Sequence, residues 1–196
     1  AEAFLAHCQT LANDDSVRVV VIRGEGKAFG VGGDLATLQT DSVNSANALI
    51  SRLHEAVLIL AKLNAPVIAS LHGVVAGGSL SLASACDLAI AAEGTRFNLA
   101  YANVAASCDV SGSWSLPRLV GLRNAMQIAL LADTFDAQEA LRLGLVNRVV
   151  PAEQLDAEVQ ALAQRLAQGP TLAYGRLKRL MRQSFETSLA DQLDAE

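Results

Sequence analysis

Ala28-Phe-Gly-Val-Gly-Gly-Asp-Leu35 and His72-Gly-Val-Val-Ala-Gly-Gly-Ser79 are two glycine-centred turns, each of which follows a strand-like apolar run and leads toward a helix-like run. Glycine lacks the Cβ obstacle, so backbone N–H groups in such turns can face outward and approach a ligand closely. Where two turns converge, their amides can donate to one developing oxyanion, and a helix N-terminus adds favourable potential. We therefore predict a site that stabilises an enolate or a tetrahedral adduct.

The composition predicts a globular chain with one sizeable core. The chain has 196 residues, of which 52% are hydrophobic, and a mean hydropathy of +0.31, values that exclude a disordered protein. Gly, Asn, Ser or charged residues interrupt every apolar run before the roughly 20 residues that a bilayer span needs. Because no signal-peptide pattern opens the chain, we expect a cytoplasmic protein without a membrane partner.

Charge and cysteine content exclude further classes of protein. The formal net charge of −5 with 15 Lys and Arg argues against binding to nucleic acid, although a local basic strip, Arg176 to Arg182, remains a candidate for phosphate contacts. Cys8, Cys86 and Cys108 are an odd number at spacings that suit neither a zinc site nor a disulfide framework. We expect reduced thiols, no metal and no dinucleotide cofactor, because neither turn has the spacing of a G-x-G-x-x-G or Walker motif.

Periodicity predicts an α/β chain. Helical patterns cover residues 3–12, 42–63, 79–85, 122–131, a short segment opened by the capping-box spacing of Asp136 and Glu139, and most of the chain from Pro151 on. Strand patterns cover residues 17–23, 67–71, 87–91 and 145–150, and a loop of small residues leads to Trp114-Ser-Leu-Pro117. This alternation favours stacked α/β layers with a helical tail.

Five segments together resemble the enoyl-CoA hydratase/isomerase, or crotonase, superfamily, in the family's order and over nearly the whole chain. They are Gly24 to Leu35, Ala65 to Gly73, Ala76-Gly-Gly78 with Cys86-Asp-Leu88, Leu116 to Gly121, and Ala137 to Val146. The resemblance implies a crotonase-like spiral of ββα units over residues 1–135 and a C-terminal helical region over 136–196 that serves trimerisation, with subunits assembled as homotrimers or hexamers. The family's first strand and the turn after it do not occur in this sequence, so we expect the start of the spiral core to be missing.

The resemblance assigns roles to the two turns. Gly33 and Gly78 match the family residues whose backbone N–H groups bind the thioester carbonyl oxygen, and the physical reading of the turns points to the same pair. Val31 and Leu35 match positions where backbone atoms meet the adenine end of CoA. The expected partner is an acyl-CoA substrate, with coenzyme A as part of the substrate and no separate cofactor.

The acid and base residues depart from the hydratase pattern. Two glutamates share the activation of water in the hydratases, but the matching positions here hold Ser81 and Tyr101. A serine hydroxyl without a base and a phenol with an ordinary pKa of about 10 are poor proton acceptors near neutral pH. The sequence therefore argues against simple hydration.

Asp109 matches the aspartate of isomerase-type relatives, which shuttles a proton along an acyl-CoA. One carboxylate suffices for that reaction, since it takes a proton from the α or γ carbon and returns it two carbons away while the enolate is held. From spacing alone, Asp109 also fits a solvated loop or an N-cap for a turn through Ser111 and Gly112.

A 4-chlorobenzoyl-CoA dehalogenase has its aspartate nucleophile at the same position, a histidine where this chain has His54, and a tryptophan where it has Tyr101. His54 fits either the surface of an amphipathic helix or the lining of the acyl pocket. Tyr101 and Trp114 fit pocket walls or core packing, and Cys108 is expected to be a packing residue rather than a nucleophile.

Three functions remain open from the sequence: an acyl-CoA isomerase that uses Asp109 as proton shuttle, a dehalogenase-like or thioesterase-like hydrolase of the same fold, and a non-catalytic CoA-binding family member. The C-terminal region also carries an apolar stripe, Leu155, Val159, Leu162 and Leu166, at helical spacing. Either the same subunit or a neighbouring one must cover it, and the resemblance favours a subunit interface.

Overall fold

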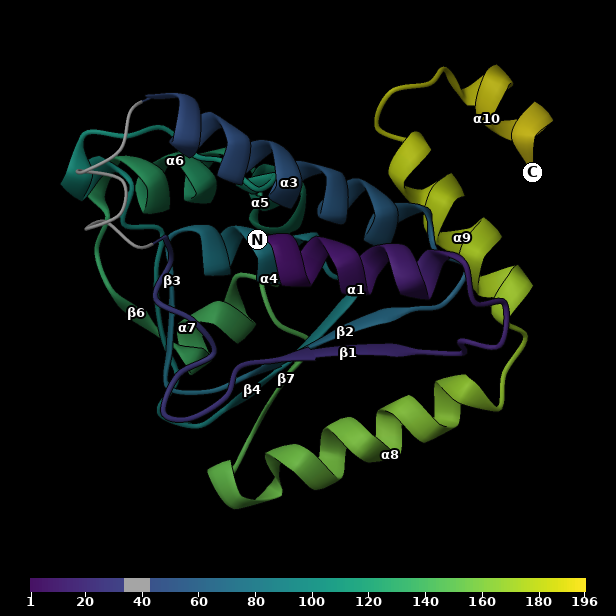
Figure 1. Cartoon of the computed structure of the whole chain (residues 1–196), viewed down its shortest axis with the longest axis horizontal. Helices are drawn as coiled ribbons and strands as arrows, with labels where there is room; N and C mark the ends of the chain where they lie inside the picture. Colours follow the sequence, from purple (N-terminus) through teal and green to yellow (C-terminus); the bar gives the residue numbers. More distant parts are fainter. Residues whose placement is uncertain (34–42) are drawn as a thin grey trace.

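The computed structural model describes residues 1–33 and 43–196, with the backbone alone for residues 43–46. Its strands form two sheets (Figure 1). The larger sheet is parallel, in the order β1 (Val20–Arg23), β2 (Val67–Leu71), β4 (Leu88–Ala92) and β7 (Arg148–Val150). The smaller sheet has the order β3 (Val74–Ala76), β5 (Arg96–Asn98) and β6 (Phe135–Asp136), with β3 parallel and β6 antiparallel to β5.

Helices cover both faces of the larger sheet. On one side α1 (Glu2–Ala12) lies along α3 (Val43–Lys62), and their buried residues Cys8, Ala56 and Leu60 pack on Val20 and Val67 (Figure 1). On the other side α8 (Leu155–Ala167) packs on Ile68, Ile90 and Ala92. The buried parallel strands are accordingly rich in apolar residues on both faces, as parallel sheets require.

The apolar stripe of α8 is covered within the subunit, so the expectation that it forms a subunit interface is wrong. Leu155 and Val159 are buried, and Leu162 and Leu166 pack beside them against β2 and β4. The strands of the same chain present enough apolar surface to bury this face, and no neighbouring subunit is needed for it.

The largest core lies between the two sheets and a group of helices: α4 (Gly78–Ala85), α5 (Gly112–Val120), α6 (Leu122–Leu131) and α7 (Ala137–Arg142). The fully buried ring of Phe97 stacks on Phe135, with centroids 5.5 Å apart. The Asp136 carboxylate accepts the Glu139 N–H at 2.9 Å, which confirms the predicted cap of α7. Single 3₁₀ turns occupy Ala102–Val104 and Ala152–Gln154.

Most predicted elements are confirmed to within a few residues, but α5 and the three strands of the smaller sheet lie outside the predicted helices and strands. The segment Val74–Ala76 is a strand rather than part of a turn, because it pairs with β5. The segment of α5 was expected to be a loop, because it contains small residues and Pro117. It is a helix, and its apolar residues Leu116 and Val120 are buried. The strand predicted over residues 145–150 is confirmed, since β7 pairs with β4 and completes the larger sheet within the region 136–196.

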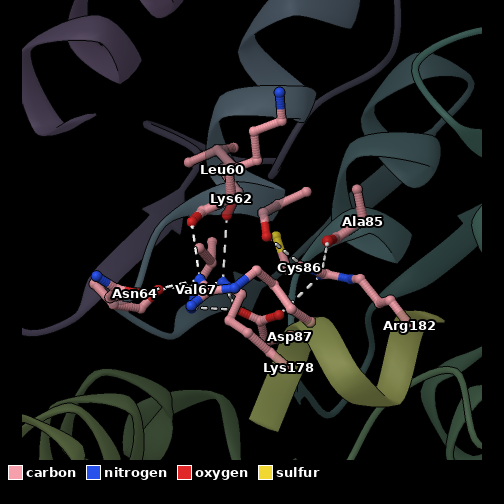
Figure 2. Close-up of polar contacts among 12 residues, drawn as sticks. Leu60, Lys62, Asn64, Val67, Ala85, Cys86, Asp87, Lys178 and Arg182 are labelled. Atoms are coloured by element: carbon pink, nitrogen blue, oxygen red, sulfur yellow. Dashed lines mark hydrogen bonds and ion pairs between the residues drawn. The ribbon is translucent and has the colours of Figure 1, made fainter. Parts of the chain in front are cut away.

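A partly buried charge cluster docks α9 (Thr171–Gln183) onto the rest of the molecule (Figure 2). The Asp87 carboxylate accepts hydrogen bonds from Lys178 Nζ at 2.6 Å, from Arg182 at 2.8 Å and from the Val67 N–H at 2.8 Å. The Lys178 side chain is 9% exposed and that of Asp87 14%. Burial lowers the pKa of Lys178, while Asp87 opposes that shift.

Three basic side chains of α9, those of Lys178, Arg179 and Arg182, donate hydrogen bonds to carbonyl groups at the C-terminus of α3. Lys178 donates to Leu60 O at 3.3 Å, Arg182 to Ala61 O at 3.1 Å and Arg179 to Lys62 O at 3.3 Å. The last carbonyls of a helix have no partner within it, and cations there also interact favourably with its dipole. In the basic strip from Arg176 to Arg182, which the sequence suggested for phosphate contacts, Lys178 and Arg182 therefore point inward to Asp87. After α9 the chain ends with a short helix, α10 (Leu189–Ala195). None of the helices within the described ranges has both the length and the apolar character that a bilayer crossing demands.

We predict that Asp87→Ala lowers the free energy of unfolding by about 3 kcal/mol, because it leaves two partly buried cations without their carboxylate. Urea denaturation measures the change. Asp156→Ala is the matched control, since it removes an exposed carboxylate that lies 3.9 Å from Arg23 and should leave the midpoint nearly unchanged. Equal effects of the two substitutions would contradict a stabilising role for the cluster.

Candidate functional site

The first glycine turn extends the smaller sheet. The Gly30 N–H donates to Val74 O at 3.1 Å, and the Ala76 N–H donates to Gly30 O at 2.9 Å, so Gly30 forms a parallel bridge with Val75. The Phe29 N–H donates to His72 O at 2.9 Å. The two turns are far apart in the sequence, but their backbones therefore lie side by side and are hydrogen-bonded to each other.

Glycine is required where the turns are closest. Gly73 has a φ of +60°, and a Cβ built on it would lie 2.0 Å from the carbonyl oxygen of Lys27. A Cβ on Gly32 would lie 3.6 Å from the amide nitrogen of Gly78, and the Gly32 N–H donates to Ser79 Oγ at 3.3 Å. Gly33 follows directly and is exposed. The structure thus brings the Gly32–Gly33 segment to the N-terminus of α4.

Gly78 is the first residue of α4 and faces two polar side chains. The N–H of Gly77 is taken by Asn98 O at 3.0 Å, whereas no hydrogen bond among the described residues uses the N–H of Gly78. A Cβ on Gly78 would lie 3.5 Å from Asp109 Oδ1 and 3.6 Å from the Tyr101 hydroxyl. The carboxylate predicted from the sequence therefore lies at the same helix terminus as the predicted amide donor.

The loop that carries Asp109 has unusual backbone geometry. Val110 has a φ of 49° and Ser111 a φ of 69°, and a β-branched residue in the left-handed region is rare. The Val110 N–H donates to His54 Nε2 at 3.1 Å, and the Val110 side chain is buried. Strained residues persist only where their surroundings hold them, and here α3 and the core do so.

A chain of hydrogen bonds runs from the interior to Asp109. The Tyr101 hydroxyl donates to Asp109 Oδ1, and Ser81 Oγ lies 3.2 Å from the Tyr101 oxygen. A tyrosine has one hydroxyl hydrogen, so Ser81 must be the donor in the second bond. Burial, followed by the bond to Asp109, raises the pKa of Tyr101, so its phenol keeps its proton.

Asp109 also lines a cavity of about 310 Å³ between α3 and the start of α5. In the described part of the chain its lining residues are His54, Val57, Leu58, Cys108, Asp109, Ser111 and Ser113, and Asp109 is the only carboxylate among them. Burial raises the pKa of the Cys108 thiol, which supports a packing role for this cysteine. Within the described parts of the chain, no group of three His, Cys, Asp or Glu residues is arranged to hold a metal ion.

The other predicted site residues differ in their surroundings. Val31 is 70% exposed, and Leu35 lies outside the described residues. The Arg118 guanidinium stacks on Trp114 at 4.0 Å from the ring centroid and faces Phe185 at 5.4 Å. Trp114 is not among the residues that line the cavity, so its role in substrate binding stays a prediction.

Sequence reasoning missed Val57 and Leu58 of the cavity and the contact between Tyr101 and Asp109. Residues 57 and 58 stand three and four positions after His54, a spacing that places all three on one face of α3. This spacing was visible in the sequence and could have predicted that Val57 and Leu58 line the same cavity as His54. The sequence carried no signal for the approach of Tyr101 to Asp109, because this contact depends on left-handed residues within and beside the loop that joins them, such as Ala105 and Val110.

Comparisons with known proteins identify the family of this chain and several of its relatives. The family model described as enoyl-CoA hydratase/isomerase matches residues 2–196. The chain is 35% identical to 1,2-epoxyphenylacetyl-CoA isomerase of Escherichia coli (strain K12), over 99% of this chain and 76% of that protein. It is 36% identical to 4-chlorobenzoyl coenzyme A dehalogenase-1 of Arthrobacter sp, over 90% of this chain and 66% of that protein. A Thermobifida fusca YX protein solved in complex with CoA has a TM-score of 0.88 and 30% identity, over 98% of this chain and 78% of that one.

Two glycine substitutions test the packing of the site. We expect Gly112→Ala to destabilise the protein by about 1–3 kcal/mol, because its Cβ would lie 2.4 Å from the Oγ of buried Ser81. Gly78→Ala should change stability by less than about 0.5 kcal/mol, since the nearest atoms to its Cβ are at ordinary contact distance. Thermal or urea unfolding of both variants checks the difference, and a Gly78 variant as unstable as the Gly112 variant would contradict the described packing.

Proposed function

Because the chain belongs to the enoyl-CoA hydratase/isomerase family, we propose that it is an acyl-CoA isomerase that moves a double bond, or opens an oxepin-like ring, by way of a thioester enolate. The family and the crotonase fold support an enzyme acting on acyl-CoA. The proposal for isomerisation rests on one observation: Asp109 is the single carboxylate among the described residues that line the cavity, and it lies beside the N-terminus of α4.

In the proposed reaction, the amides of Gly33 and Gly78 donate to the thioester carbonyl oxygen. As negative charge builds on that oxygen, the α carbon becomes acidic, and Asp109 removes a proton from it. The electron pair of the broken C–H bond spreads over the dienolate. Asp109 then returns the same proton to the γ carbon, which shifts the double bond by one position and restores the carbonyl.

The residues beside Asp109 favour isomerisation over hydration. Ser81 has no exposed surface, and Tyr101 holds its proton, so neither acts as the second base that activation of water requires. A single carboxylate is sufficient for proton transfer between two carbons of one substrate, because it acts first as base and then as acid.

A dehalogenase-like or thioesterase-like hydrolase that uses Asp109 is the second candidate, and the position of His54 in the same cavity favours it. A hydrolase needs a base for water. His54 Nε2 already accepts the Val110 N–H, so a neutral ring carries its proton on Nδ1 and has no free lone pair. This bond weighs against hydrolysis. A non-catalytic CoA-binding role is the third candidate, and the position of Asp109 beside the N-terminus of α4 weighs against it.

We propose further that coenzyme A enters as part of the substrate and that the reaction needs no separate cofactor. We also propose that the protein assembles as a homotrimer or hexamer. Exposed apolar residues on α6 support the assembly, because Leu122, Met126 and Leu130 stand four residues apart on one face and are 51–72% exposed. Such a stripe is typical of a surface that another subunit covers.

We predict that the purified protein converts 3-enoyl-CoA and leaves 2-enoyl-CoA and 4-chlorobenzoyl-CoA unchanged. Asp109→Asn should lower kcat for 3-enoyl-CoA at least about 10²-fold, because the amide cannot take up the proton. Product formation is followed by chromatography of the CoA esters. Hydration of 2-enoyl-CoA, or release of chloride from 4-chlorobenzoyl-CoA, would contradict the proposal.

Gly78→Pro removes one proposed donor. Proline is tolerated at the first position of a helix, and Gly77, with φ 53° and ψ −129°, already lies outside the helical region that proline disfavours before it. We expect kcat to fall about 10²–10³-fold with the fold intact by circular dichroism. Gly78→Ala keeps the N–H and controls for added bulk, so equal losses in the two variants would argue against the amide.

A further inference from the structure

The hydrogen-bond chain through Ser81, Tyr101 and Asp109 has a direction. Tyr101 donates its one hydroxyl hydrogen to Asp109 Oδ1 and accepts from Ser81 Oγ, which has no exposed surface. Hydrogen bonds in such a chain polarise and strengthen one another, and a bond to a carboxylate is stronger than one between neutral groups. The carboxylate of Asp109 is therefore anchored to the interior through a single oxygen.

The anchoring separates the two oxygens of Asp109. Among the described residues, its side-chain hydrogen bonds engage Oδ1 alone, and the side chain borders the cavity. The backbone is held as well, because the next amide, that of Val110, donates to His54. With main chain and Oδ1 both fixed, the orientation of Oδ2 is set.

We infer that Tyr101 is a positioning residue, which holds Asp109 by Oδ1 so that Oδ2 exchanges the proton with the substrate. This inference rests on the proposed function, because it assigns Tyr101 a role through Asp109. It also replaces the reading of Tyr101 as a pocket wall, since Tyr101 does not line the cavity. Misplacement of a reacting group by about 1 Å can cost about 10²-fold in rate, so the loss of this bond should appear in the rate of proton transfer.

Ser81 holds the Tyr101 hydroxyl from the side opposite Asp109 in the hydrogen-bond chain. The first residue of α5, Gly112, packs on it so closely that a Cβ there would lie 2.4 Å from Ser81 Oγ. The close approach of α4 and α5 keeps the serine hydroxyl against Tyr101 and leaves no room for a longer side chain. The serine donates to the Tyr101 oxygen, which orients the phenol hydrogen toward Asp109.

The test compares Tyr101→Phe with Tyr174→Phe in the intact protein. Tyr174 is the only other tyrosine, lies on α9 away from the cavity, and loses the same hydroxyl. We expect Tyr101→Phe to lower kcat for 3-enoyl-CoA by about 10–100-fold. The Kd for a saturated acyl-CoA, which binds but has no double bond to move, should stay within about twofold, because the hydroxyl acts on Asp109 and not on the ligand. Tyr174→Phe should match the unsubstituted protein in both measurements.

Ser81→Ala keeps the inference testable if Tyr101→Phe fails to fold, and it should lower kcat by a smaller factor with the same unchanged Kd. An unchanged kcat in Tyr101→Phe, or a parallel loss of kcat and acyl-CoA affinity, would overturn the inference. Asp109→Asn in the same assays separates the two levels. If it retains kcat, the proposed function fails; if it loses kcat while Tyr101→Phe does not, only the positioning role fails.

Discussion

The main-chain contact between the two glycine turns is the constraint on which the rest of the molecule depends. Gly30 pairs with Val75 as a strand would, and Gly73 admits no side chain because the carbonyl of Lys27 occupies that space. Two backbones approach this closely only where Cβ atoms are absent. The contact brings the Gly32–Gly33 segment to the first turn of α4, where helix geometry leaves amides without partners. The proposed oxyanion site uses this arrangement, in which both donors come from the main chain.

The remaining wall of the site is held from a distance. His54, Val57 and Leu58 lie on α3, whose last carbonyls accept hydrogen bonds from Lys178, Arg179 and Arg182 of α9 (Figure 2). Asp87, at the start of β4, balances two of these cations. The C-terminal region thus fixes the end of the helix that forms one side of the cavity, and α9 belongs to the structural support of the site although it contributes no residue to the cavity lining.

The polar groups of the site divide into those that support and those that face the cavity. Ser81 is enclosed by α5, Tyr101 bridges it to Asp109, and His54 holds the following amide. Each of these groups has a hydrogen-bond partner, so little polar surface is buried without compensation. The strained backbone at Val110 and Ser111 is the cost of directing Asp109 toward α4. The result is one carboxylate with a fixed orientation.

The sequence by itself determined the α/β class and most helices and strands, because periodicity acts locally along the chain. Glycine spacing predicted that the two turns form one site, and the family resemblance added Asp109 to it. The sequence also contained the spacing of three and four residues that places His54, Val57 and Leu58 on one face of α3. The tertiary structure alone decided that α8 is covered by its own sheet, that Val74–Ala76 is a strand, and that Tyr101 contacts Asp109. These features depend on which distant surfaces meet and on left-handed residues such as Val110, for which an alanine-, serine- and valine-rich loop carries no local signal.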